Sequence, residues 1–181
     1  MIKKRFILAQ GSMDGACFLY SMANATKALT GKETIDAQCW SDMLRGLTHV
    51  GDFLDQLVGT ERRDTRPGRQ IAMVEQMMRA LAPDTGIVVS LVPYDELTGR
   101  RLAALIDAHS VLVVGTQEHW VCAVDIDFEA RRLLVADSSE LLESEKYAEK
   151  RGGQFGRIFN KKWSAAPQKR YASAFRISLA G

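Results

Sequence analysis

The chain has 181 residues, of which 46% are hydrophobic and 25% charged, and its formal net charge is +2. These values predict one ordinary globular domain covering residues 1–181, large enough to bury a core unaided. No apolar run approaches the roughly 18 residues of a membrane helix, and the apolar stretch 6–9 is too short for a signal peptide. We therefore expect a cytoplasmic protein as synthesised, with secretion by a route independent of a signal peptide left open.

The cysteines limit the chemistry that the chain can support. There are three, Cys17, Cys39 and Cys122, an odd number with no Cys-x-x-Cys pair. This pattern indicates neither a disulfide framework nor a zinc knuckle. We expect at least one free thiol, no metal site and no cofactor.

Basic residues gather towards the C-terminus. After Glu149 the chain carries eight cationic residues and no acidic one: Lys150, Arg151, Arg157, Lys161, Lys162, Lys169, Arg170 and Arg176. Two interpretations are open, a solvated rim and a docking surface for an acidic partner. The aromatic residues do not interleave this cluster as a nucleic-acid platform requires, which argues against nucleic acid.

The first half of the chain has helical periodicity. After a short apolar strand at 6–9 and a glycine-containing turn, apolar and small residues recur at three- and four-residue steps from Cys17 to Ala28. Gly31 is placed to end that helix. Further helices are predicted over 34–47, 53–58 and 67–81.

The second half changes to β-branched runs. Strands are predicted over 86–92, 111–114, 119–126, 132–137 and 172–179, with a helix over 102–108. Helices followed by antiparallel strands predict an α+β fold, in which an N-terminal helical lobe packs on a C-terminal antiparallel sheet. The cleft between such lobes is the expected place for an active site.

Cys17 is the candidate nucleophile. It follows a glycine-rich turn and lies at the predicted start of a helix, where unpaired N–H groups favour the reactive thiolate form. Gly11 and Gly15 leave backbone N–H groups open to a substrate oxygen. Asp14 is the natural N-cap of this helix.

A thiolate nucleophile needs a base, and the chain has three histidines. His49 and His109 lie at predicted helix ends, where histidine is commonly a surface residue or a partner of the helix dipole. His119 opens an apolar strand instead. Asp137 ends the next strand, so two adjacent antiparallel strands bring Asp137 beside His119.

These residues resemble the papain-like cysteine protease superfamily, and most nearly its small bacterial branch that includes the bacteriocin-leader-processing peptidases. The order Gln10, Cys17, His119, Asp137 is similar to the family's order of oxyanion donor, nucleophile, base and orienting residue. Gln10 and Cys17 are seven residues apart, where about six is usual. The resemblance covers roughly 6–30 and 105–140, while 31–104 match no family pattern.

The resemblance implies acyl transfer through a Cys17 thioester on a protein or peptide substrate, with hydrolysis of a peptide or isopeptide bond expected first. Glutamine deamidation and transglutamination by a bacterial effector or toxin use the same chemistry and stay open. So does a non-catalytic binding or immunity module on the same scaffold. In that case Cys17 is a buried helix cysteine, His119 a satisfied strand-end histidine and Asp137 a turn-former.

Overall fold

The computed structural model describes residues 6–8, 16–47, 67–116, 119–139, 148–166 and 171–180. Three α-helices precede the first strand, a short one follows it, and the strands of the main sheet are antiparallel, so the fold is α+β, as the sequence predicts. The elements in chain order are α1 (Cys17–Thr30), α2 (Ala37–Arg45), α4 (Pro67–Leu81), β1 (Ile87–Leu91), the 3-10 helix η2 (Tyr94–Glu96), α5 (Gly99–Ala104), β2 (Ser110–Gly115), β3 (Trp120–Asp127), β4 (Arg132–Ala136), β5 (Lys150–Gly152), β6 (Arg157–Phe159), β7 (Lys161–Ser164) and β8 (Ser173–Leu179).

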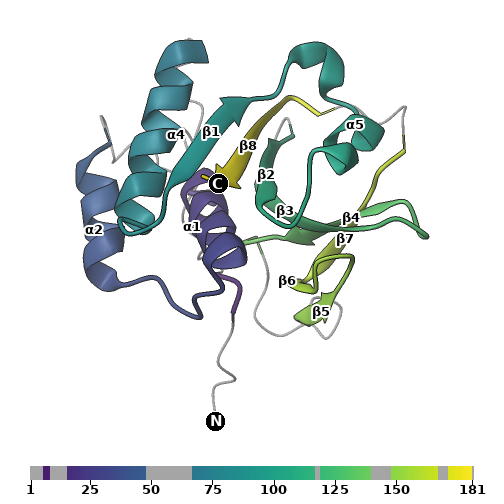
Figure 1. Ribbon diagram of the computed structural model, residues 1–181, viewed down its shortest axis with the longest axis horizontal. Coiled ribbons are helices and arrows are strands. Elements are labelled where there is room, and N and C mark those ends of the chain that lie inside the picture. Colours follow the sequence, from purple (N-terminus) through teal and green to yellow (C-terminus); the bar gives the residue numbers. More distant parts are fainter. Residues whose placement is uncertain are drawn as a thin grey trace.

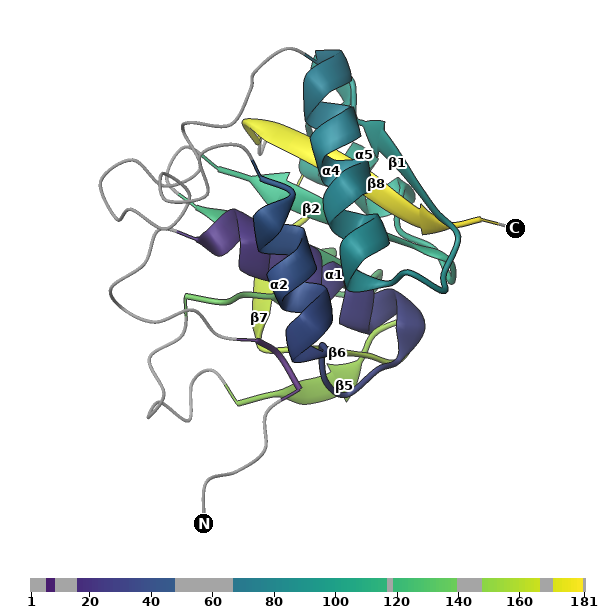
Figure 2. The same cartoon turned by 90° about the vertical axis from the view of Figure 1, so that its left-hand side faces the viewer.

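The main sheet is antiparallel throughout. Its six strands lie in the order β1-β8-β2-β3-β4-β7, and β5 and β6 form a separate hairpin. Helices α1, α2 and α4 gather on one side of the sheet, whereas α5 lies on the other (Figures 1 and 2). The sheet therefore lies between two layers of helix. Helix α1 packs directly on the sheet, on the same side as α2 and α4.

Each face of the sheet has its own apolar core, because alternate residues of a strand point to opposite faces. In β2, Val111 and Val113 pack with the buried side of α1, whereas Leu112 and Val114 pack with α5. Strand β2 is thus buried on both sides, which explains its continuous apolar run.

Helix α1 is buried around almost its whole circumference. Its C-terminal cap is Gly31 in the left-handed conformation (φ 69°), as its position in the sequence predicts. At the other end the N-cap is Ala16, with no side-chain cap, so the predicted capping role of Asp14 is wrong. Asp14 itself lies outside the described residues.

The segment before α1 does not form the strand expected at 6–9. Residues 6–8 are irregular because side chains supply their hydrogen-bond partners. Asn24 of α1 accepts from the Leu8 N–H (2.8 Å) and donates to its carbonyl (3.0 Å). The Glu149 carboxylate accepts from the N–H groups of Phe6 (3.0 Å) and Ile7 (2.6 Å). Residues 6–8 are thus held against α1 and against Glu149, which directly precedes β5.

Two predicted helices differ in their bounds, and a third cannot be compared. The helix expected over 34–47 is shorter, starting after the N-cap Asp36, whose carboxylate accepts from the Gln38 N–H. The helix expected over 102–108 lies earlier, at 99–104, because Thr98 caps it. Its expected end is a turn in which Asp107 accepts from the His109 N–H (2.7 Å). The helix expected over 53–58 lies outside the described residues.

Two buried charged side chains, those of Asp125 and Arg157, dock the β5–β6 hairpin onto the main sheet. Asp125, fully buried at a bulge in β3, accepts from the N–H groups of Phe155 and Arg157. The Arg157 guanidinium donates to three backbone carbonyls, those of Ala108, Ser110 and Val124. Burial without such partners is costly for both charges, so these hydrogen bonds fix where the hairpin lies.

The C-terminal basic residues are distributed over the molecule. Arg157 is buried, Lys162 pairs with Asp127 (3.3 Å), and Arg176 pairs with Asp107 (2.7 Å). Lys161 is paired at the candidate active site described below. These four cations have structural contacts, and the docking surface that the sequence left open stays a prediction.

Among the residues that the structure describes, no helix combines the length and the apolar character needed to cross a membrane.

Candidate active site

Cys17 is the first residue of α1 and is 7% exposed. The next residue, Phe18, makes an edge-to-face contact with Trp120, the residue after His119, with ring centroids 4.8 Å apart. Trp120 stacks in turn on Phe175 of β8. This buried aromatic cluster fixes the start of α1 against the start of β3, and so sets Cys17 next to His119.

The backbone of His119 is held by Thr116 across the β2–β3 connection. The Thr116 hydroxyl accepts from the His119 N–H (3.0 Å), and the Thr116 N–H donates to the His119 carbonyl (2.8 Å). The imidazole Nε2 lies 2.9 Å from Oδ1 of Asp137. The ring also hydrogen-bonds the Cys17 side chain. Because Nε2 faces Asp137, the nitrogen left for Cys17 is Nδ1.

Asp137 directly follows β4. Cys122 of β3 pairs with Ala136 of β4, so the start of β3 and the end of β4 lie at the same end of the hairpin. Asn160 fixes the Asp137 backbone, accepting from its N–H (2.9 Å) and donating to its carbonyl (2.8 Å). The juxtaposition of His119 and Asp137 expected from the strand order is present.

The Asp137 carboxylate is saturated with donors. Besides His119, Oδ1 accepts from the N–H (2.8 Å) and the hydroxyl (2.6 Å) of Ser139. Oδ2 accepts from the ammonium of Lys161 (2.7 Å). A carboxylate with its side chain only 3% exposed is stabilised as an anion by such partners.

The two groups shift each other's protonation. Burial is the largest single influence on the pKa of His119 and lowers it, but the hydrogen bonds and charges of Asp137 and Cys17 outweigh it and raise the pKa from 6.5 to about 9. Burial likewise raises the pKa of Asp137, yet the donors His119, Lys161 and Ser139 lower it well below 3.8. At neutral pH the site therefore holds an imidazolium between a carboxylate and a sulfur atom.

The other thiols and the second described histidine lie elsewhere. Cys122 is fully buried in β3, where burial raises the pKa of its thiol far above 9. Cys39 is half-buried in α2, and all three cysteines are free. His109 lies in the turn before β2. Within the described ranges, no group of three or more His, Cys, Asp or Glu side chains is placed to hold a metal ion.

Three of the four residues singled out in the sequence thus meet in space: Cys17, His119 and Asp137. Gln10, the fourth, lies outside the described residues, as do 117–118 and 140–147, which border the expected cleft in sequence. Sequence analysis missed Thr116, Ser139, Asn160 and Lys161. Only Ser139 carried a local signal, as a hydroxyl two residues after an aspartate.

No protein-family model matches the sequence, and no curated protein matches it either.

Proposed function

We propose that this protein is a papain-like cysteine enzyme that hydrolyses a peptide or isopeptide bond through a Cys17 thioester. One observation carries the proposal: Cys17, His119 and Asp137 form a hydrogen-bonded chain at the start of a helix that packs on an antiparallel sheet. A histidine that is charged at neutral pH and faces a thiol is the arrangement of a thiolate-imidazolium pair.

In the acylation step, the two ring nitrogens of His119 have different roles. The Cys17 sulfur attacks the substrate carbonyl carbon, and the carbonyl π electrons move to oxygen. His119 then gives its Nδ1 proton to the leaving amine as the C–N bond breaks, which leaves a thioester and a neutral imidazole. Asp137 keeps the Nε2 proton in place throughout, so Nδ1 is the nitrogen that exchanges protons.

Deacylation reverses these roles. Neutral His119 removes a proton from water through Nδ1, the hydroxide adds to the thioester carbon, and the C–S bond breaks to restore the Cys17 thiolate. The backbone N–H of Cys17 at the start of α1 is one oxyanion donor in the proposal, and the side chain of Gln10 is the second.

Thiol labelling tests the site without knowledge of the substrate. Iodoacetamide should label Cys17 much faster than Cys39, and should do so at slightly acidic pH, because the charged His119 stabilises the thiolate. In His119→Gln the advantage of Cys17 over Cys39 should disappear. Equal labelling rates at Cys17 in the wild type and in His119→Gln would remove the support for a reactive pair.

Turnover assigns the roles. Proteins and peptides from a cell lysate are incubated with the enzyme, and mass spectrometry reports new termini, one-dalton deamidation or cross-linked products. Cys17→Ser and His119→Ala should abolish the change, Gln10→Ala should lower the rate about 10²-fold, and Asp137→Asn should leave residual activity. Cys39→Ser is the matched control and should act like wild type. Full activity in Cys17→Ser would show that Cys17 is not the nucleophile, whereas no turnover by the wild type on any substrate pool would favour the binding scaffold.

A further inference from the structure

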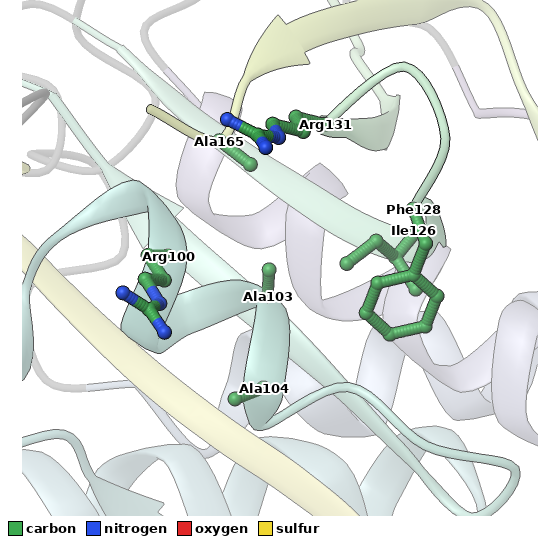
Figure 3. Close-up of a pocket in the computed structure, with 7 residues that line it drawn as sticks. All are labelled: Arg100, Ala103, Ala104, Ile126, Phe128, Arg131 and Ala165. Carbon is green, nitrogen blue, oxygen red and sulfur yellow. The ribbon is translucent and has the colours of Figure 1, made fainter. Parts of the chain in front are cut away.

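A cavity of about 470 Å³ lies on the α5 face of the sheet, the face opposite the one that α1 covers. Its floor is apolar: Ile126 of β3 is 2% exposed, and Ala103 of α5 and Ala165 after β7 are also buried. Figure 3 shows the cavity between α5, the β3–β4 turn and the chain after β7. The small alanine side chains leave this volume open.

Two guanidinium groups border the cavity, from Arg100 of α5 and Arg131 of the β3–β4 turn. In Figure 3 they lie towards one side, while the Phe128 ring and Ile126 lie towards the other. Among the described residues, neither guanidinium has a hydrogen-bond or ion-pair partner. The cavity therefore joins an apolar half to a cationic half whose donors are available.

The backbone at Arg131 is in an unusual conformation. Its φ is +51°, and no other non-glycine residue in the described part of the chain has a positive φ. Glycine and asparagine adopt this conformation at less cost, so an arginine at this position makes the turn less stable. From this position the Arg131 side chain lines the cavity, as Ala165 does (Figure 3).

Phe128 is the apolar counterpart of these cations. Its side chain is 59% exposed, which is unusual for a large apolar residue, and it borders the same cavity. An aromatic ring at the rim offers a surface on which a flat apolar group stacks. The combination of ring, apolar floor and two guanidinium groups is suited to a ligand with one apolar and one anionic end.

We propose that this cavity binds a small organic anion, in which a carboxylate or phosphate group is attached to a flat apolar body. The volume falls in the range of roughly 300–1,000 Å³ that small-molecule sites occupy. Arg100 and Arg131 bind the anionic group, and Phe128 and Ile126 contact the apolar body. Guanidinium groups suit both anions because they donate several N–H groups in a fixed plane.

The cavity is separate from the Cys17 site. His119 and Asp137 lie at one end of the β3–β4 hairpin, whereas Phe128 and Arg131 belong to the turn at its other end. Strand β3, with eight residues, spans about 25 Å between them. Binding here does not depend on the proposed catalytic role of Cys17, and Cys17→Ala should bind as the wild type does.

Calorimetric titration of the full chain with three probes of one shape tests the proposal: naphthoate, naphthyl phosphate and the neutral naphthamide. At least one anion should bind with a dissociation constant below about 1 mM, at least tenfold more tightly than the amide. Whether the carboxylate or the phosphate binds more tightly identifies the anionic group. An anion that binds no better than the amide, or no binding by either anion, would overturn the proposal.

Variants locate the binding. Arg100→Gln and Arg131→Gly should each weaken the anion at least about tenfold, as expected when a charge-assisted hydrogen bond is lost. The exposed neighbours Arg101 and Arg132 do not line the cavity, so Arg101→Gln and Arg132→Gln are matched controls and should bind normally. Arg131→Gly should also keep or raise the melting temperature, because glycine relieves the positive φ. Wild-type binding in both lining variants would contradict the site.

Discussion

The His119 ring lies between the Asp137 carboxylate and the Cys17 thiol, and its charge follows from that position. We predict that His119 titrates at about pH 9, as the raised pKa indicates. Asp137→Asn should lower this pKa, because the anion that stabilises the imidazolium is lost. Lys161→Met should raise it, because a cation 2.7 Å from Asp137 no longer offsets the carboxylate.

Nuclear magnetic resonance of the imidazole signals measures these shifts. The chain has three histidines, so the His119 signal is assigned by its loss in His119→Gln. Lys162→Met is the control for Lys161→Met, since Lys162 pairs with Asp127 instead. A His119 pKa that does not move in Asp137→Asn would show that the carboxylate is not what raises it.

For single residues, the sequence predicts the three side chains that meet at the candidate site and misses the residues that hold them in place. Cys17, His119 and Asp137 have a recognisable order and recognisable element positions. Asn160 and Lys161, which fix the Asp137 backbone and carboxylate, are more than 20 residues away in the chain and lie beside a short strand. Their role depends on β7 pairing with β4, which no local pattern indicates.

Among the elements, the contact between α1 and β3 is the one that sets the distance from Cys17 to His119. Gly115 of β2 faces Trp120 of β3, and a Cβ at Gly115 would lie 2.8 Å from the indole ring. Gly115→Ala must therefore displace the Trp120 ring, which packs on Phe18. We expect a loss of about 1–3 kcal/mol in the free energy of unfolding, the usual cost of overpacking.

Gly115→Ala should also lower the labelling rate of Cys17, because Phe18 and Trp120 adjoin Cys17 and His119 in sequence. Denaturant unfolding and iodoacetamide labelling measure the two effects. Gly68→Ala in α4 is the control: a Cβ there has no atom within 4 Å, and alanine favours the helix. Unchanged stability and labelling in Gly115→Ala would show that this packing does not position the site.

Element types follow from periodicity where the segments are long. The 15 residues of α4 carry an apolar stripe at helical spacing, and the predicted bounds 67–81 are confirmed. Strands β5, β6 and β7 have three or four residues each and were not predicted, because so short a segment shows no alternation. The strand expected at 6–9 is absent because Asn24 and Glu149 take the place of a neighbouring strand.

At the scale of the whole molecule, the two sites that we propose lie on opposite faces of the sheet. Helix α1 and the Cys17 site lie at one end of the β3–β4 hairpin, and the Arg100–Arg131 cavity lies at the other. The α+β class follows from the sequence, but the strand order does not. The last strand, β8, inserts between β1 and β2, a long-range pairing that depends on the complete chain.

The charged groups of the Cys17 site should make the free energy of unfolding of the whole protein depend on pH. A raised folded-state pKa at His119 contributes stability that is fully present below pH 6.5 and is lost as the pH rises through about 9. A lowered pKa at Asp137 contributes stability that is present above pH 3.8 and is lost in acid. Between these limits both contributions are present, so we expect a stability plateau at mildly acidic pH.

The alkaline limb is the sharper test, because many carboxylates titrate in acid and only three histidines are present. Urea unfolding under reducing conditions should lose up to about 3 kcal/mol between the plateau and the far side of pH 9 through His119. His119→Gln should be less stable than wild type on the plateau, and the difference should shrink as the pH rises. His109→Gln, at an exposed turn, is the matched control. A constant difference between wild type and His119→Gln across this range would show that the His119–Asp137 pair does not stabilise the folded chain as a charged pair.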